Sequence, residues 1–146
     1  MFIEISINPI APSCHLLNGL AVEARQQRYQ FMDRLLDEAR SQTNVFQKEG
    51  ECFCGAFADG LLVGCGGVNQ DPYLDRKVGR LRHVYVLQAY RRSGIAATLV
   101  RDLLRRSESA FKIIRLRTSD ESASKFYDTL GFMRTNHETA THVLEI

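Results

Sequence analysis

The chain has 146 residues, of which 45% are hydrophobic and 25% are charged, and its formal net charge is +2. This size and composition predict a single globular domain over residues 1–146 and exclude a disordered or low-complexity chain. No run of 18 apolar residues is present, so no membrane span is expected. The four cysteines and the lack of an export signal at the N-terminus favour the cytoplasm.

The N-terminal part predicts a strand and then a helix. Three isoleucines alternate with polar residues within residues 1–10, which is typical of a strand with one solvent-exposed face. From residue 28 to residue 39, apolar side chains recur at steps of three and four, which predicts an amphipathic helix.

A β-hairpin follows. Asp59-Gly60 separates two apolar runs, residues 52–58 and 61–68, and both positions of such a two-residue turn require a positive φ. A tight turn at this point would place Cys54 opposite Cys65. Reduced thiols are expected in the cytoplasm, although this register would allow a disulfide under oxidation.

Strands and helices alternate in the C-terminal half, and their β-α-β order implies a parallel pair of strands. The predicted strands are residues 81–86, 111–118, 132–135 and 141–145. One helix begins at residue 95. A second has the spacing of a capping box at Thr118 and Glu121 and a stop signal at Gly131.

Basic residues are concentrated in the middle of the chain. Residues 76–117 contain twelve Lys or Arg and two acidic residues, so this segment carries +10 and the rest of the chain carries −8. Within it, the loop Arg91-Arg92-Ser93-Gly94-Ile95-Ala96 leads into a helix, whose N-terminal N–H groups and dipole attract anions. The loop suits a pyrophosphate, but it matches neither the phosphate loop of nucleoside triphosphatases nor the dinucleotide-binding glycine motif.

The flanks of this loop form a longer pattern. Val84-Tyr85-Val86 is followed, after four residues, by Arg-x-x-Gly-x-Ala, an amphipathic helix, a strand and Phe126-Tyr127-x-x-Leu130-Gly131-Phe132. This pattern, over about residues 81–133, closely resembles the GNAT superfamily of N-acetyltransferases. The resemblance implies an α/β (α+β) fold: a mixed, mostly antiparallel sheet of six to seven strands flanked by helices. It also implies that strands four and five splay apart to admit acetyl-coenzyme A (acetyl-CoA).

The resemblance also assigns cofactor-binding residues. Backbone N–H groups of the loop would bind the coenzyme A pyrophosphate, and the fourth strand would pair with the pantetheine arm. The residues concerned are Val84, Tyr85, Val86, Arg91, Arg92, Ser93, Gly94, Ile95, Ala96, Asp120 and Tyr127. Around the cofactor, the chain departs from the family pattern at Gln88, which replaces a frequent proline, and at Asp120, which replaces a frequent asparagine.

The expected reaction transfers an acetyl group to a primary amine. Tyr127 is the candidate general acid, because a phenol with a pKa of about 10 stays protonated at pH 7 and can protonate a thiolate. The resemblance assigns it the same role, although its position on an apolar stripe also suits packing. A backbone N–H of Val84 or Val86 could polarise the thioester carbonyl.

The general base is not identified. An acceptor amine with a pKa of about 10.4 costs about 4.6 kcal/mol to deprotonate at pH 7. Many family members carry a glutamate on the fourth strand, but Arg82 occupies that position here. His83, His142 and Glu51 are the alternatives. Arg82 and Arg117 could instead bind an acidic group of the acceptor.

The expected partners are acetyl-CoA and an amine-bearing acceptor, with no nucleic acid and no membrane, and a homodimer remains open. The acceptor pocket is expected near residues 25–36 and 71–73. Two alternatives are an inactive acetyl-CoA-binding module and a nucleic-acid-binding domain. The second depends on a shared face of arginines: Arg80, Arg82, Arg91, Arg92, Arg101, Arg105 and Arg106. No metal is expected, because Cys52-x-Cys54 lacks the paired spacing of zinc sites.

Overall fold

The computed structural model describes residues 3–75 and 77–146. Met1 and Phe2 of the predicted first strand, and Arg76 at the start of the basic segment, lie outside the described residues. The strands are β1 (Ile5–Pro9), β2 (Cys52–Ala58), β3 (Leu61–Gln70), β4 (Val78–Val86), β5 (Ile113–Leu116), β6 (Met133–Arg134) and β7 (His142–Glu145). The helices are α1 (Leu17–Gln26), α2 (Phe31–Arg40), α3 (Ile95–Ser107) and α4 (Glu121–Thr129), with a 3₁₀ turn η1 (Gln88–Tyr90).

The described strands form one mixed sheet in the order β1-β2-β3-β4-β5-β7-β6. Neighbouring strands are antiparallel except for β4 and β5, which are parallel. β4 and β5 pair only through residues 78–80 and 113–115. Among the described strands, none pairs with the remainder of β4 on its β5 side, which confirms the predicted fold and the splay.

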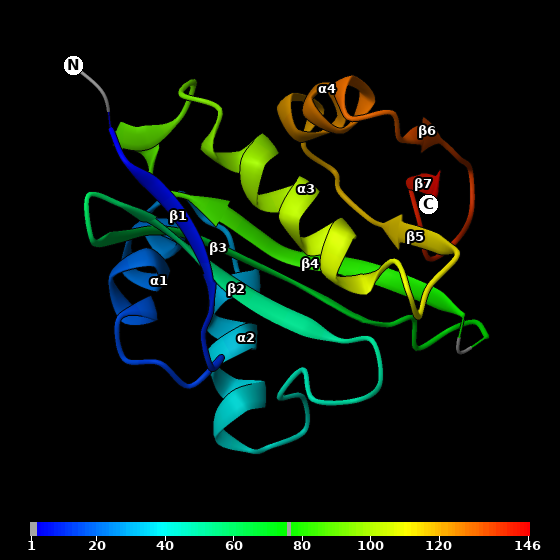
Figure 1. Ribbon diagram of the computed structural model, residues 1–146, viewed down its shortest axis with the longest axis horizontal. Helices are drawn as coiled ribbons and strands as arrows, with labels where there is room; N and C mark the ends of the chain where they lie inside the picture. The colour runs from blue at the N-terminus through cyan, green and yellow to red at the C-terminus, as the bar shows by residue number, and fades with distance from the viewer. Residues whose placement is uncertain (1–2, 76) are drawn as a thin grey trace.

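Helices cover both faces of the sheet (Figure 1). α1 and α2 bury Leu17, Leu20, Met32 and Leu35 against one face. On the other face, apolar side chains of α3 and α4 pack over β3, β4 and β5. The sheet thus lies between two apolar cores, and the loop from β4 to α3 lies at the C-terminal end of β4, an interior strand of the sheet.

The predicted helix over residues 28–39 is confirmed as α2, but it begins three residues later. Residues 27–30 form a turn between α1 and α2, in which Arg28 has φ +67° and the Tyr29 N–H donates to Ala24 O at 2.9 Å. Helix α1 has no counterpart among the predicted elements. Its buried residues nevertheless follow helical spacing, so the signal was present in the sequence.

The hairpin turn is confirmed at Asp59 and Gly60, which have φ values of +48° and +84°. The predicted register is wrong, because an irregularity beside residues 56 and 57 shifts the pairing by one position. Cys54 lies opposite Gly66, and Cys65 lies opposite Gly55. Since successive side chains alternate between faces, a one-residue shift places the two thiols on opposite faces of the sheet.

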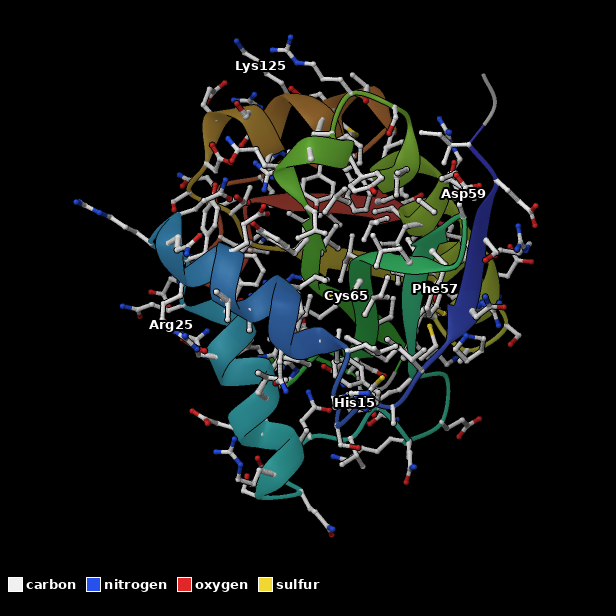
Figure 2. All side chains as sticks on the ribbon, turned by 90° about the vertical axis from the view of Figure 1, so that its left-hand side faces the viewer. His15, Arg25, Phe57, Asp59, Cys65 and Lys125 are labelled. Atoms are coloured by element: carbon white, nitrogen blue, oxygen red, sulfur yellow. The ribbon has the colours of Figure 1, made fainter. Side chains whose placement is uncertain are left out.

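The separate surroundings of the two thiols agree with this register. Cys65 lies in the α1/α2 core with its Sγ 3.7 Å from Met32 Sδ, whereas Cys54 packs in the core beneath α3. Figure 2 shows Cys65 in the interior of the molecule, beside α1. The disulfide that the predicted register would allow is therefore excluded in the folded protein.

The predicted capping box of α4 is also wrong. Asp120 is the N-cap, and its Oδ1 accepts a hydrogen bond from the Ser122 N–H at 3.2 Å. Thr118 Oγ1 instead accepts from the Asp120 N–H at 3.1 Å. The stop signal is correct, since Gly131 has φ +93° just after the helix.

Candidate active site

The start of α3 presents a row of main-chain donors. Gly94 is the N-cap in the left-handed conformation, with φ +83°, and Arg92 has φ +65°. Among the described residues, no protein group accepts a hydrogen bond from the N–H groups of residues 92–97. A Cβ built on Gly94 meets no atom within 4 Å, so the backbone is open on this side. Such a row at a helix N-terminus is suited to binding phosphate oxygens.

The two arginines of the loop are oriented differently. Arg91 Nε donates to Val86 O at 2.9 Å, its Nη2 donates to Gln27 Oε1 at 3.0 Å, and its guanidinium carbon lies 5.2 Å from the centre of the Tyr85 ring. The Arg91 side chain therefore points toward Gln27 and Tyr85 and stabilises the loop from that side. Arg92 is exposed and forms no ion pair or hydrogen bond with a described residue.

The unpaired edge of β4 begins where β5 turns away. The Leu87 N–H donates to Val63 O on β3 at 2.8 Å, so by alternation the N–H of Val86 faces the opposite edge, toward the splay. The β3–β4 pairing also has an irregularity, which lies at His83, whose φ is +61°. Such a bulge changes the direction of the strand, and Val84 follows it directly.

Tyr127 lies on α4 in the α3/α4 core. Its ring centre is 5.5 Å from that of Phe132 and 6.0 Å from that of His142. Burial raises the pKa of the Tyr127 phenol above its ordinary value, so the hydroxyl stays protonated at neutral pH. The structure gives the hydroxyl no hydrogen-bond partner among the described residues, although the ring itself is closely packed.

The candidate bases have different surroundings. The Glu51 carboxylate accepts from the N–H groups of Lys48 (3.0 Å) and Gln70 (2.8 Å), so it has a structural role at the base of the hairpin. His142 is buried, its Nδ1 lies 2.9 Å from Thr141 Oγ1, and burial lowers its pKa. Neither ring nitrogen of His83 has a partner among the described residues.

Arg82 is engaged with protein groups on the α2 side of the sheet. Its guanidinium lies 3.6 Å from Glu38 Oε1 and donates to Asn69 Oδ1 at 3.4 Å. These contacts fix Arg82 beside α2. The suggested role of Arg82 in binding an acidic group of the acceptor stays a prediction. Among the described residues, Arg117 has no ion pair or hydrogen bond from its side chain.

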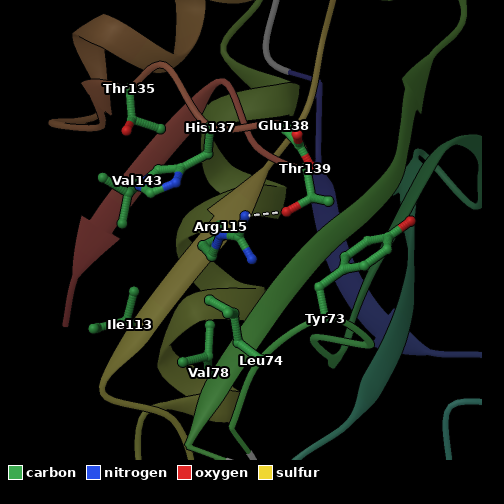
Figure 3. A pocket seen from close by; sticks show the side chains of 10 residues that line it. All are labelled: Tyr73, Leu74, Val78, Ile113, Arg115, Thr135, His137, Glu138, Thr139 and Val143. Atoms are coloured by element: carbon green, nitrogen blue, oxygen red, sulfur yellow. Dashed lines mark hydrogen bonds between the residues drawn. The ribbon is translucent and has the colours of Figure 1, made fainter.

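A cavity of about 550 Å³ opens on the α1/α2 face beside the last rung of the β4–β5 pair (Figure 3). Arg115 lines it from β5, and its side chain is on this face because its neighbours Ile114 and Leu116 point into the opposite core. The lining residues are Tyr73, Leu74, Val78, Ile113, Arg115, Thr135, His137, Glu138, Thr139 and Val143. Tyr73 belongs to the expected acceptor region, whereas the residues from the β6–β7 connection were not anticipated.

The floor of this cavity is a fixed polar network. Asp71 Oδ2 lies 3.1 Å from Arg115 Nη1 and 3.4 Å from Arg80 Nη1, and the Asp71 side chain is fully buried. Arg115 also donates to Thr139 Oγ1, the bond drawn in Figure 3. One carboxylate therefore holds two guanidinium groups, and the network ties both loops at the mouth of the cavity to the sheet.

The arginines proposed for nucleic-acid binding do not form one face. Arg105 and Arg106 pair with Asp102 on α3, whereas Arg80 and Arg82 point to the α2 side of the sheet. No group of three or more His, Cys, Asp or Glu side chains suited to a metal occurs in residues 3–75 and 77–146. Within the same residues, no helix is both long enough and apolar enough to cross a membrane.

Comparison with known proteins shows the family. Residues 17–132 match the model of the acetyltransferase (GNAT) family. The chain therefore belongs to the GNAT family of acetyltransferases, as the sequence motifs predicted, and this family uses acetyl-CoA.

Curated relatives and solved structures agree with this assignment. N-acetyltransferase family 8 member 3 of Rattus norvegicus is 36% identical over 97 residues, which cover 63% of this chain and 42% of that protein. N-acetyltransferase 8 of Homo sapiens is 30% identical over 130 residues, covering 84% and 57%. The chain thus spans about half the length of these relatives.

Among solved structures, a candidate acetyltransferase from Exiguobacterium sp. 255-15 has a TM-score of 0.83 and 29% identity, covering 99% of this chain and 94% of that one. The PaiA N-acetyltransferase from Thermoplasma acidophilum, solved in complex with coenzyme A, has a TM-score of 0.67 and 20% identity over 96% of each chain. The second likeness concerns the fold alone.

Proposed function

We propose that residues 1–146 form a single-domain N-acetyltransferase that uses acetyl-CoA to acetylate a primary amine. The row of free N–H groups at residues 92–97 carries this proposal, because it lies beside the splayed edge of β4. Six main-chain donors at a helix N-terminus match the oxygens of a pyrophosphate. The coenzyme A complex of the Thermoplasma protein, which shares the fold, supports the same ligand.

The residues present fit this cofactor. The exposed backbone at Ser93 and Gly94 leaves room for phosphate oxygens, and Arg92 adds a positive charge that no described acidic side chain neutralises. The outward-facing N–H of Val86 can pair with an extended amide chain as an added strand would. Acetyl-CoA would supply the activated acetyl group.

Proton transfer is assigned to Tyr127 as the general acid. Burial raises the pKa of the phenol and keeps it protonated at neutral pH, so the hydroxyl can donate its proton to the sulfur as the carbon–sulfur bond breaks. Asp120, by contrast, is occupied as the N-cap of α4, so its proposed role is to fix the start of that helix. The acceptor amine would approach from the α1/α2 face through the cavity around Arg115.

The experiment compares two glycines with matched conformations. Gly94 has φ +83° and Gly60 has φ +84°, and a Cβ built on either one meets no atom within 4 Å. Gly94→Glu and Gly60→Glu therefore impose similar backbone strain, but only the first places a carboxylate beside the free N–H row. Calorimetry should show that Gly60→Glu binds coenzyme A like the wild type and that Gly94→Glu weakens binding at least about 100-fold, since each tenfold corresponds to 1.4 kcal/mol.

Two results would count against the proposal. The first is a wild-type protein that is folded by circular dichroism but gives no heat with coenzyme A or acetyl-CoA. The second is equal affinity in the two glycine variants. A panel of primary amines, assayed for thiol release with acetyl-CoA, would then identify the acceptor class.

A further inference from the structure

Glu23 of α1 and Gln27, which caps the C-terminal end of that helix, both contact the loop between β4 and α3. Glu23 Oε2 accepts a hydrogen bond from the Tyr85 hydroxyl at 2.5 Å and another from the Gln88 N–H at 3.0 Å. Gln27 Oε1 accepts from Arg91 Nη2 at 3.0 Å and lies 3.0 Å from the same hydroxyl. Residues four apart lie on the same side of a helix, so both contacts come from one side of the C-terminal end of α1 and its cap.

These contacts hold both ends of the η1 turn. Gln88 is the first residue of η1, and its N–H is one of the donors that a short helix leaves unpaired at its start. Arg91 directly follows the last residue of η1 and is held by Gln27, by the carbonyl of Val86 and by the Tyr85 ring. The turn is therefore fixed immediately before the N–H row of residues 92–97.

Tyr85 anchors this arrangement inside the protein. Its side chain is buried in the α1/α2 core, with the ring 6.4 Å from that of Tyr29 and 6.1 Å from that of Phe31. Burial raises the pKa of its phenol, and the Glu23 carboxylate acts in the same direction. The hydroxyl thus remains a donor to Glu23 at neutral pH.

We propose that Glu23 and Gln27 are positioning residues, which brace the η1 turn so that the N–H row of residues 92–97 is ordered before coenzyme A binds. This inference rests on the proposed function, because an ordered N–H row affects ligand affinity only if coenzyme A binds to that row. Ordering a loop before association reduces the entropy lost on binding and so raises affinity. In this proposal Arg91 does not contact coenzyme A but stabilises the loop through its hydrogen bonds to Gln27 and Val86.

The test measures coenzyme A affinity by calorimetry in matched variants. Glu23→Ala removes two hydrogen bonds and should weaken binding about tenfold, whereas Glu23→Gln keeps an oxygen acceptor and should stay within about threefold of wild type. Gln27→Ala should weaken binding about threefold. Gln26→Ala alters the exposed neighbour on the same helix and should bind like the wild type.

A double-mutant cycle separates bracing from general destabilisation. Since Gln27 reaches the loop through Arg91, Gln27→Ala should have little effect in an Arg91→Ala background. Additive losses in the cycle, or equal affinity of Glu23→Ala and the wild type, would overturn the inference. Equal losses in Glu23→Ala and Glu23→Gln would overturn it as well.

Hydrogen exchange provides a readout that does not depend on cofactor. In the free protein, the Gln88 amide should exchange at least about tenfold faster in Glu23→Ala than in Gln26→Ala, because only the former loses its acceptor. Unchanged exchange would refute the brace. A wild-type protein that does not bind coenzyme A would refute the proposed function, whatever the exchange data show.

Discussion

His83 lies at the bulge of β4 with its ring buried between two phenylalanines. Its ring centre is 6.4 Å from that of Phe31 and 6.2 Å from that of Phe46, and the residue is only 6% exposed. Burial lowers the pKa of His83 to about 3, and the charge of Arg82 acts in the same direction. The unfolded chain, with a histidine pKa of about 6.5, therefore binds a proton that the folded protein excludes.

This difference makes the folded protein acid-sensitive. A histidine with a depressed folded pKa favours the unfolded state as the pH falls below the unfolded pKa, and its effect grows until the folded pKa is reached. Between pH 7 and pH 5, His83 alone should lower the free energy of unfolding by about 2 kcal/mol. The result depends little on the folded pKa, provided that this value lies well below 5.

The assay is urea unfolding at pH 7 and pH 5. His83→Asn removes the titrating ring, and asparagine tolerates the positive φ of +61° at this position. The loss of stability between the two pH values should be about 2 kcal/mol smaller in this variant than in the wild type. His15→Asn, which removes an exposed histidine, should match the wild type. An equal pH dependence in His83→Asn and the wild type would refute the reasoning.

Two further predictions concern Tyr127 and the cysteines. Tyr127→Phe should lower the turnover number, measured by thiol release, by about 10²- to 10⁴-fold. The same variant should change coenzyme A affinity, measured by calorimetry, by less than about twofold. Unchanged turnover would exclude Tyr127 as the general acid. Burial raises the pKa of the Cys65 and Cys52 thiols to about 12, so both should react slowly with a thiol reagent in the folded protein and quickly in denaturant. Mass spectrometry after mild oxidation should find no bond between Cys54 and Cys65, and finding one would contradict the register described above.

Much of the fold could be predicted because local signals agreed with the tertiary structure. The hairpin at Asp59-Gly60, the end of α4 at Gly131 and the loop before α3 each depend on a few neighbouring residues. The register of the hairpin could not be predicted, since a single inserted position at a bulge reverses the face of every later side chain.

The candidate site follows most directly from the sequence where it consists of main chain. The N–H row follows from a glycine at a helix start, which is a local property. Glu23 and Gln27 meet the loop more than 60 positions along the chain, and nothing in their immediate sequence distinguishes them from ordinary helical residues. The Asp71–Arg115 pair likewise depends on which strands become neighbours.

The short parallel pairing of β4 and β5 divides the sheet into unequal halves. In the part of the chain that the structure describes, the β1-β2-β3-β4 side is joined to the β5-β7-β6 side by the pairing of residues 78–80 with 113–115 and by the adjacent bond from the Lys112 N–H to Lys77 O. A ligand bound along the open edge of β4 would contact both parts of the sheet. Binding of the ligand would therefore make it harder for the two parts to separate. Resistance to proteolysis, compared with and without coenzyme A, would then report on the fraction of the protein that has ligand bound.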